Sequence, residues 1–310
     1  MRAFVLTETG TTPELIDLQV PEPTEGEVRV RVHAASVNGF DLSVASGRLK
    51  GMMEHRFPVV LGKDFAGTVD AIGAGVTDYQ VGDRVFGVVT KPFLGDGSFA
   101  EYVTVATGVG LALLPEQISF VEGAALGLAG AAAIAAVDAA ELQPGQTALV
   151  IGATGGVGNQ VVQLAAAAGA QVLATAAPGD QQQLVRDLGA STTLDYNVDV
   201  IGTVRQAHPD GVDVVFHFAG DPNAVLPAVR SGGRFVSTMI MSPEQLPSQD
   251  ATVTSIYANP DRGTLDRAAA HQADATSRVT IQDTYPLDQA SVALAAFAAG
   301  TLGKLVITTT

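Results

Sequence analysis

The residues best suited to chemistry lie in a glycine-rich turn between an apolar run and a helical pattern. Ala148–Ile151 is typical of a strand, Gly152–Gly158 follows at once, and the alanine-rich stretch after Asn159 is typical of a helix. Backbone N–H groups at such a turn lack partners and lie at the positive end of the helix, so they can hold a pyrophosphate. The spacing departs from G-x-G-x-x-G, because Ala153 stands in place of the first glycine. The turn predicts nucleotide binding, with an ordinary glycine turn as the alternative.

Such a turn needs a parallel sheet to position it, and residues 119–258 have the pattern of one. Gly155 and Gly156 would let a ligand approach the backbone, and Gly158 would let the helix pack against the strand. Apolar runs alternate with helical patterns at the spacing of β–α–β units, which predicts a doubly wound parallel sheet with helices on both faces. The expected strands are 147–151, 171–176, 192–195, 212–218 and 233–237.

The two ends of the chain have a different pattern. Residues 1–118 contain many short strands with Gly-Asp turns, which predicts a small antiparallel barrel. Val28–Ala34 alternates with period two, so we expect one face of that strand to be buried. Residues 259–310 return to mixed structure and end in a strand at 304–308.

The composition excludes several classes of protein. Of the 310 residues, 47% are hydrophobic and 16% charged, which describes a globular chain of about two domains. The net charge of −15 argues against a nucleic-acid partner. The chain has no cysteine, which excludes disulfides, thiolate catalysis, Fe–S clusters and cysteine-bound zinc. Its five histidines lack metal-binding spacing, so no metal is expected.

No membrane segment is expected. Met1–Leu6 shows no basic-then-apolar signal pattern. The longest uncharged apolar run, Gly123–Val137, falls short of the roughly 20 residues that a membrane span needs, and it predicts a buried helix instead. We therefore expect a cytoplasmic protein.

Several short motifs are weak alone but specific in their order and spacing. They are Ala35–Asp41, Ser46–Gly47, Leu61–Gly67, Val81–Val85, Phe99–Val103, Gly152–Gly158, Leu188–Ala190, Ser231–Arg234 and Gly303–Lys304. With them, the chain resembles the medium-chain dehydrogenase/reductase superfamily, in its zinc-free quinone oxidoreductase (zeta-crystallin-like) branch, over essentially its whole length. The resemblance implies a Rossmann domain (119–258) inserted into a GroES-like β-barrel domain built from 1–118 and 259–310, with the cofactor between the two. It also implies a homodimer.

The resemblance also shows what is missing. Zinc alcohol dehydrogenases of this superfamily carry a cysteine near Val37–Asn38, Gly-His-Glu at 62–64, and a four-cysteine lobe after about residue 90. Here the first site has Asn38, the second has Gly62–Lys63–Asp64, and the lobe is absent. Without a Lewis acid, alcohol oxidation is disfavoured, but hydride transfer to an electron-poor small molecule remains feasible. The resemblance thus implies an NADPH-dependent oxidoreductase acting on quinones or α,β-unsaturated carbonyls. The alternatives are an enoyl or 2-alkenal reductase, and a low-turnover NADPH-binding sensor or structural protein.

Three residues are candidates for catalysis. The resemblance implies that Asn38 faces the nicotinamide and offers an amide donor to a substrate carbonyl; its alternative role is to cap a turn. Asp41 and Lys63 are the others, and Lys63 would either steady a developing oxyanion or neutralise a carboxylate. Ser43 stands where family members often have a tyrosine donor, and Ala132 replaces a threonine that contacts the nicotinamide.

The cofactor is expected to be NADPH, with NADH as the alternative. The end of the second strand, Ala174–Pro178, has no Asp or Glu to accept a ribose 2′-OH, and a carboxylate would repel a 2′-phosphate. Against this, the expected Lys or Arg is missing there, and Arg186 is the nearest cation. His217, within an apolar strand, is expected to be a hydrogen-bonded core residue. The expected cofactor-binding residues are Thr154, Gly155, Gly156, Val157, Thr175, Ala176, Tyr196, Phe218, Ala219, Gly220, Met239 and Ile240.

Overall fold

The computed structural model describes residues 1–309, and the chain divides into two compact units. Unit 1 consists of Met1–Leu128, Pro260–Ala273 and Ile281–Thr310, and unit 2 consists of Ala129–Asn259 and Asp274–Thr280. The first boundary therefore lies later than residue 118, and a short C-terminal segment returns to unit 2.

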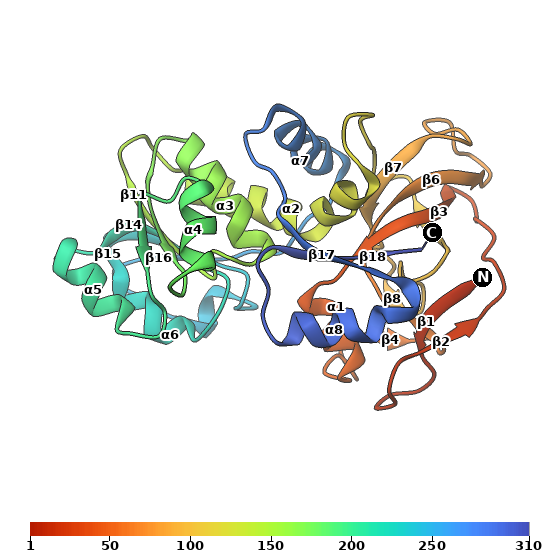
Figure 1. Ribbon diagram of the computed structural model, residues 1–310, viewed down its shortest axis with the longest axis horizontal. Coiled ribbons are helices and arrows are strands. Elements are labelled where there is room, and N and C mark those ends of the chain that lie inside the picture. The colour runs from red at the N-terminus through yellow and green to blue at the C-terminus, as the bar shows by residue number, and fades with distance from the viewer. Residues whose placement is uncertain (310) are drawn as a thin grey trace. The chain divides into compact units, whose positions relative to one another are not determined.

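Unit 1 is built on a sheet whose strands come from both ends of the chain (Figure 1). The order is β10-β7-β6-β3-β18-β17, and β9 also pairs with β3; every pairing is antiparallel except that of β17 with β18. Val28, Val30 and Val32 of β3 are buried while Arg31 is exposed, which confirms the alternation predicted there. The strands are β3 (Glu27–Ser36), β6 (Asp64–Ile72), β7 (Arg84–Val88), β9 (Tyr102–Ala106), β10 (Leu111–Leu113), β17 (Ile281–Pro286) and β18 (Lys304–Thr308).

Smaller sheets and three helices complete unit 1. One sheet joins β2 (Glu14–Asp17), β1 (Arg2–Leu6) and β5 (Val59–Val60), and another pairs β4 (Glu54–His55) with β8 (Phe93–Leu94). The helices are α1 (Gly39–Ala45), α7 (Arg262–Asp274) and α8 (Ala290–Ala298), which follows a short 3₁₀ turn at Leu287–Gln289. The sequence predicted only mixed structure for residues 259–310 and did not predict helix α7.

Unit 2 is a six-stranded parallel sheet in the order β13-β12-β11-β14-β15-β16. Numbered along the unit, this is the 3-2-1-4-5-6 order of dinucleotide-binding folds. The expected doubly wound parallel sheet is confirmed. Its strands are β11 (Thr147–Ile151), β12 (Gln171–Thr175), β13 (Thr192–Leu194), β14 (Val212–His217), β15 (Val229–Ser237) and β16 (Thr252–Ser255).

The helices of unit 2 connect these strands. They are α3 (Gly156–Ala167), α4 (Asp180–Asp187), α5 (Val200–Ala207) and α6 (Pro222–Val225), with 3₁₀ turns at Leu226–Ala228 and Pro243–Gln245. α3 packs on β11 and β12, and α4 packs on β13. α6 is a single turn, since Pro227 has no N–H to continue it.

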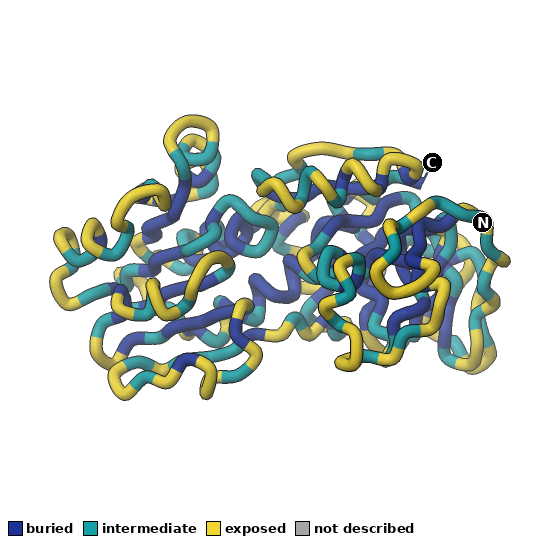
Figure 2. The backbone as a smooth tube through the Cα atoms, turned by 90° about the horizontal axis from the view of Figure 1, so that it is seen from below, coloured by how far each residue is buried: buried dark blue, intermediate teal, exposed yellow. Residues whose placement is uncertain are grey.

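One long helix, α2 (Phe120–Ala140), is apolar enough to cross a membrane by length and composition. However, 67% of its most apolar window is buried inside the protein, as in the core helix of a globular fold. This confirms the buried helix predicted from the apolar run. In each unit the buried residues follow the strands, and the exposed residues gather in turns and on outer helix faces (Figure 2).

Candidate functional site

The turn after β11 has the geometry that a phosphate-binding turn requires. Gly152 has φ of +78°, in the left-handed region that favours glycine. A Cβ on Gly158 would lie 2.2 Å from the carbonyl oxygen of Gly152, so only glycine lets α3 pack this closely. This confirms the packing role predicted for Gly158. α3 begins at Gly156, and its N-cap Gly155 has no side chain to occupy the first N–H groups of the helix.

Thr175 lies beneath this turn and holds it. Its buried hydroxyl accepts the N–H of Gly152 at 3.0 Å and donates to the carbonyl oxygen of Val150 at 3.3 Å. The next residue, Ala176, is also buried, and its N–H donates to the carbonyl oxygen of Leu194. Both residues were expected to bind cofactor, but the hydroxyl of Thr175 and the N–H of Ala176 form hydrogen bonds within the protein. Contact of either with the cofactor stays a prediction.

A pocket of about 340 Å³ lies at the carboxyl ends of the central strands of unit 2. Ligands of open parallel sheets bind at this edge. The expected cofactor-binding residues that line it are Thr175, Tyr196, Ala219 and Gly220, and Tyr196 is 49% exposed. Its walls are mainly apolar and include Ile151 and Ile201, which suits the face of an aromatic ring.

The remaining expected contacts in unit 2 differ in accessibility. Thr154, Val157 and Phe218 are half-buried, and Phe218 stacks on Phe216 with ring centres 6.2 Å apart. Met239 is exposed, and Ile240 is buried in the apolar core. Because the side chain of Ile240 packs into the core, only the backbone of Ile240 could make the expected contact with the cofactor.

His217 and Ser237 pair at the same edge of the sheet. The Nδ1 of His217 lies 3.0 Å from the Oγ of Ser237, which also accepts the N–H of Met239 at 3.0 Å. Burial lowers the pKa of His217. This buried, hydrogen-bonded arrangement confirms the core role predicted for the histidine.

In unit 1, strand register brings polar residues of β3, β6 and β18 together. Ser36 lies opposite Asp64, and Val306 lies opposite Ser36 on the other side of β3. Continuing that register by two residues places Lys304 level with Asn38, which follows β3 and precedes α1.

Asp64 is the centre of this cluster and is completely buried. Its Oδ2 accepts the hydroxyl of Ser36 at 2.7 Å and the Nδ2 of Asn38 at 2.8 Å, and its Oδ1 accepts the N–H of Leu128 at 2.9 Å. A Cβ on Gly127 would lie 2.5 Å from Oδ1, so only glycine leaves room for the carboxylate.

Lys304 supplies a buried cation beside Asp64, with only 3% of its surface exposed. Its ammonium donates to the carbonyl oxygen of Val37 at 3.0 Å and to the Oδ1 of Asn38 at 2.7 Å, and it lies 3.5 Å from the Oδ2 of Asp64. Burial lowers the pKa of Lys304, while the charges of Asp64 and Asp41 oppose that shift. The sequence had pointed to Ser36 and Lys304 only as parts of the motifs Ala35–Asp41 and Gly303–Lys304, and it had given neither residue a role in the site.

Asp41 is buried on α1 and holds Asn38 through the backbone. Its Oδ2 accepts the N–H of Asn38 at 2.8 Å, whereas its Oδ1 has no hydrogen-bond partner among residues 1–309. Burial raises the pKa of Asp41 to about 7; the negative charge of Asp64 adds to the rise, and the Asn38 N–H, Lys304 and Lys63 oppose it. Asp41 therefore titrates near neutral pH.

Lys63 is half-buried beside the same carboxylates. Its ammonium donates to the carbonyl oxygen of Val89 at 2.8 Å and lies 4.9 Å from the centre of the Phe40 ring. Burial lowers the pKa of Lys63, and the charges of Asp41 and Asp64 oppose the shift. The structure thus brings Asn38, Asp41 and Lys63 together, as a catalytic role for them requires.

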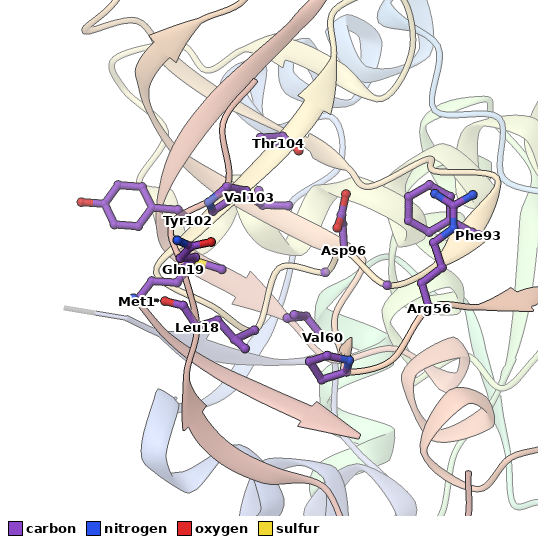
Figure 3. Close-up of a pocket in the computed structure, with 14 residues that line it drawn as sticks. Met1, Leu18, Gln19, Arg56, Val60, Phe93, Asp96, Tyr102, Val103 and Thr104 are labelled. Carbon is purple, nitrogen blue, oxygen red and sulfur yellow. Dashed lines mark hydrogen bonds between the residues drawn. The ribbon is translucent and has the colours of Figure 1, made fainter. Parts of the chain in front are cut away.

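A separate pocket of about 410 Å³ lies elsewhere in unit 1 (Figure 3). Val60 and Phe93 line it, together with Asp96 and Arg56, whose guanidinium lies 3.7 Å from the centre of the Phe93 ring. None of the expected site residues lines this pocket, so it is not part of the candidate site.

Comparison with known proteins identifies the family. Residues 24–116 match the alcohol dehydrogenase GroES-like domain, and residues 156–259 match a domain described as zinc-binding dehydrogenase. The chain is 31% identical over 300 residues to a quinone oxidoreductase of Sus scrofa, across 91% of this chain and 89% of that protein. The chain belongs to the medium-chain dehydrogenase/reductase superfamily, in its quinone oxidoreductase branch. The expected resemblance and fold class are confirmed.

Other relatives of this dehydrogenase/reductase are named for other activities. It is 34% identical to an NADPH-dependent alkenal/one oxidoreductase of Arabidopsis thaliana, over 76% of this chain and 62% of that protein. It is 37% identical, over 72% of its length, to a mycocerosic acid synthase-like polyketide synthase of Mycolicibacterium smegmatis, of which it spans only 10%.

Solved structures agree with the fold of the branch. The quinone oxidoreductase from Coxiella burnetii superposes with a TM-score of 0.90 at 26% identity, over 100% of this chain and 99% of that one. An NAD-dependent alcohol dehydrogenase gives 0.89 at 28% identity, with 100% of each chain covered. A mycobacterial protein complexed with NADPH gives 0.86 at 26% identity, with 99% of each chain covered.

The protein is therefore an oxidoreductase that uses a nicotinamide cofactor, and unit 2 fits that group. Gly155 and Gly156 leave the first N–H groups of α3 without a capping side chain, and the apolar pocket lies at the same edge of the sheet. These are the two parts that a pyrophosphate and an aromatic ring of a dinucleotide require.

Proposed function

We propose that the protein is a zinc-independent, NADPH-dependent oxidoreductase that transfers a hydride to quinones or related α,β-unsaturated carbonyls. The carrying observation is the polar cluster of unit 1, in which Asn38 and Lys63 occupy the positions where zinc-dependent members have metal ligands. Relatives named quinone oxidoreductase and alkenal/one oxidoreductase support this substrate class.

The side chains of the cluster do not fit a zinc ion. Zinc sites use thiolate, imidazole or carboxylate ligands, usually four in a tetrahedron. Position 38 offers an amide, and Lys63 and Lys304 bring ammonium groups that repel a dication. Within the described part of the chain, no three His, Cys, Asp or Glu side chains are placed to share a metal.

NADPH is the proposed cofactor because the end of β12 has no carboxylate to oppose a 2′-phosphate. The residues that follow it are Ala176, Ala177 and Pro178, and Gln181 accepts the N–H of Ala177. Arg186, the nearest cation, is exposed and donates to Gln182 and to the hydroxyl of Thr193. The ratio of kcat/KM for NADPH to that for NADH tests this choice; a ratio below one would contradict it.

The unit 1 cluster supplies positioning for the reaction. When bound, the nicotinamide supplies the hydride. Quinone oxygens can take their protons from water, so hydride transfer to a quinone needs orientation more than a protein acid. The Asn38 amide would donate to the acceptor carbonyl, and the half-buried ammonium of Lys63 would favour developing negative charge.

A panel assay tests the proposal directly. Purified protein is mixed with NADPH and a series of quinones, enones and 2-alkenals, and cofactor oxidation is followed by the loss of NADPH absorbance. We expect turnover of quinones. The absence of oxidation across the whole panel would overturn the proposed function and favour the alternative of a low-turnover NADPH-binding protein.

The cofactor site is tested separately with Gly156→Asp. This change puts a side chain and a negative charge where the pyrophosphate is proposed to lie. NADPH affinity, measured by fluorescence titration, should fall sharply with the fold retained. Gly108→Asp is the matched control, because Gly108 is exposed in unit 1 with open space around its Cα. Equal affinities for the wild type and Gly156→Asp would refute the placement.

A 2-alkenal reductase is the second candidate, favoured by the similarity to the plant alkenal/one oxidoreductase. The two are distinguished by kcat/KM for a 2-alkenal against that for a quinone.

We also propose a homodimer, since β16 ends the sheet of unit 2 with one edge unpaired by any described strand. Light scattering on protein eluted from a size-exclusion column measures the molar mass, which should be twice that of one chain; the mass of a single chain would contradict the homodimer.

A further inference from the structure

Lys304 is the one buried cation of the unit 1 cluster, and its strand has no other charged residue. A lysine in such a place loses hydration that must be replaced by acceptors. Its two short hydrogen bonds go to the carbonyl oxygen of Val37 and to the Oδ1 of Asn38. The Asp64 carboxylate, at 3.5 Å, is farther away. The shorter of these bonds is thus made to a residue proposed to meet substrate.

This contact fixes which way the Asn38 amide faces. A lysine ammonium only donates hydrogen bonds, so the atom that faces Lys304 must be the amide oxygen. The Nδ2 then faces Asp64, where it donates at 2.8 Å, and its second hydrogen is directed to the carbonyl oxygen of Ser36 at 3.3 Å. Lys304 and Asp64 together leave the amide one orientation.

The two hydrogens of Nδ2 differ in how firmly they are held. The bond to the ionisable Asp64 is short, whereas the bond to Ser36 lies near the long limit for an N–H···O contact. Asn38 is half-buried, while its partners Ser36, Asp64 and Lys304 are buried, so of these four residues Asn38 is the one that a ligand can reach. A substrate carbonyl oxygen can replace the weak bond to Ser36 at small cost.

Lys304 also changes the strength of that exchangeable donor. A cation bonded to the amide oxygen draws electron density from the nitrogen, and hydrogen bonds in such chains strengthen one another. We propose that Lys304 is a positioning residue that orients and polarises the Asn38 amide, so that its Nδ2–H stabilises the oxygen of the carbonyl acceptor during hydride transfer. The proposal rests on the proposed function, because it needs a carbonyl acceptor.

The kinetic test is a double-mutant cycle with quinone as acceptor. Removing one donor to a developing oxyanion costs about 10²–10³ in kcat, so we expect Asn38→Ala to lose about 100-fold. Lys304→Met, which keeps the length of the side chain without its charge, should lose about tenfold in kcat with little change in KM for NADPH. In the Asn38→Ala background, Lys304→Met should change kcat less than about twofold. Lys50→Met, at an exposed lysine of the same unit, is the control and should keep wild-type kcat.

A merely structural lysine would give a different pattern. If Lys304 only fastened β18 to β3, its loss would lower kcat by the same factor with or without Asn38, and that result would overturn the proposal. An unchanged kcat in Lys304→Met would do the same. Should Lys304→Met fail to fold, the doubly neutral Asp64→Asn/Lys304→Met replaces it, since removing both charges of a buried pair leaves neither uncompensated. Its kcat is then compared with that of Asp64→Asn alone, because Asp64 also accepts from Asn38.

A second measurement needs neither cofactor nor turnover. The side-chain amide signals of Asn38 in ¹⁵N-labelled protein are assigned by their loss in Asn38→Ala. In Lys304→Met the Nδ2 protons should move upfield as their hydrogen bonds weaken, and in Lys50→Met they should stay in place. Unmoved signals would overturn the polarisation. A wild type that reduces no quinone or enone would instead overturn the proposed function, and the amide signals would still decide whether Lys304 orients Asn38.

Discussion

Asp41 makes the stability of the protein depend on pH in a way that one substitution should remove. The carboxyl group is buried, and burial raises its pKa to about 7 from its ordinary value of 3.8. Because the folded state holds this proton more tightly than the unfolded state, folding is most favoured at low pH for this group, and that contribution is lost as pH rises through about 4 to 7.

The size of the effect follows from the two pKa values. A shift of about three units corresponds to about 4 kcal/mol in total, of which about 2.5 kcal/mol falls between pH 5 and pH 8. Asp41→Asn cannot ionise, and its amide oxygen can still accept the N–H of Asn38. Its buried NH₂ lacks an acceptor where Oδ1 lacked a partner, which costs roughly 1–3 kcal/mol at every pH.

Urea unfolding followed by far-UV circular dichroism at pH 5, 6.5 and 8 measures this. We expect the free energy of unfolding of Asp41→Asn, relative to that of the wild type, to rise by about 2.5 kcal/mol from pH 5 to pH 8. His33 and His217 also titrate, but Asp41 is not among the groups that shift their pKa, so they act equally in both proteins and drop out of the difference. Asp17→Asn, the same change at an exposed site of unit 1, should run parallel to the wild type. Parallel curves for Asp41→Asn as well would refute the reasoning.

Two further substitutions test the turn of unit 2. Gly158→Ala puts a methyl group 2.2 Å from the carbonyl oxygen of Gly152 and should destabilise unit 2 by about 1–3 kcal/mol in urea unfolding, whereas Gly108→Ala, with open space around it, should stay within about 0.5 kcal/mol; equal midpoints would contradict the packing. Thr175→Val leaves the N–H of Gly152 without its acceptor and should cost about 1–3 kcal/mol and weaken NADPH binding in fluorescence titration; unchanged stability and affinity would show that the hydroxyl does not hold the turn.

The architecture of unit 2 could be predicted because its signals are local. The apolar run at Thr147–Ile151 ends at a residue that must be glycine, and the next helix starts four residues beyond Gly152. Each strand–helix step repeats that pattern, so the order of the elements implies the parallel sheet. Helix α7 was not predicted, because its stretch Arg262–Asp274 mixes polar residues on most faces and its apolar positions are short alanines.

The candidate site was predicted less completely because it depends on pairing between distant strands. Asn38, Asp41 and Lys63 could be named as candidates from the sequence, whereas Lys304 also stands in a motif but could be given no role there. Lys304 acts beside them only because β18 pairs with β3, a contact across more than two hundred residues of chain. In the same way, nothing local to Thr175 or Ile240 shows that the hydroxyl of one is used beneath the turn and that the side chain of the other packs into the core.

The charge balance of the cluster predicts how the enzyme responds to metal removal. In a zinc dehydrogenase the metal provides positive charge beside the reacting oxygen. Here the buried Asp64 already has three hydrogen-bond donors, the hydroxyl of Ser36, the amide of Asn38 and the N–H of Leu128, and the ammonium of Lys304 lies 3.5 Å from its Oδ2. A zinc ion would have to displace that ammonium and bind an amide, which is a poor ligand for it. We therefore expect dialysis against EDTA to leave kcat with quinones unchanged, and added zinc to leave it unchanged as well. Loss of activity on chelation, restored by zinc, would mean that the cluster rearranges to bind metal and that Lys304 does not hold Asn38 in the working enzyme.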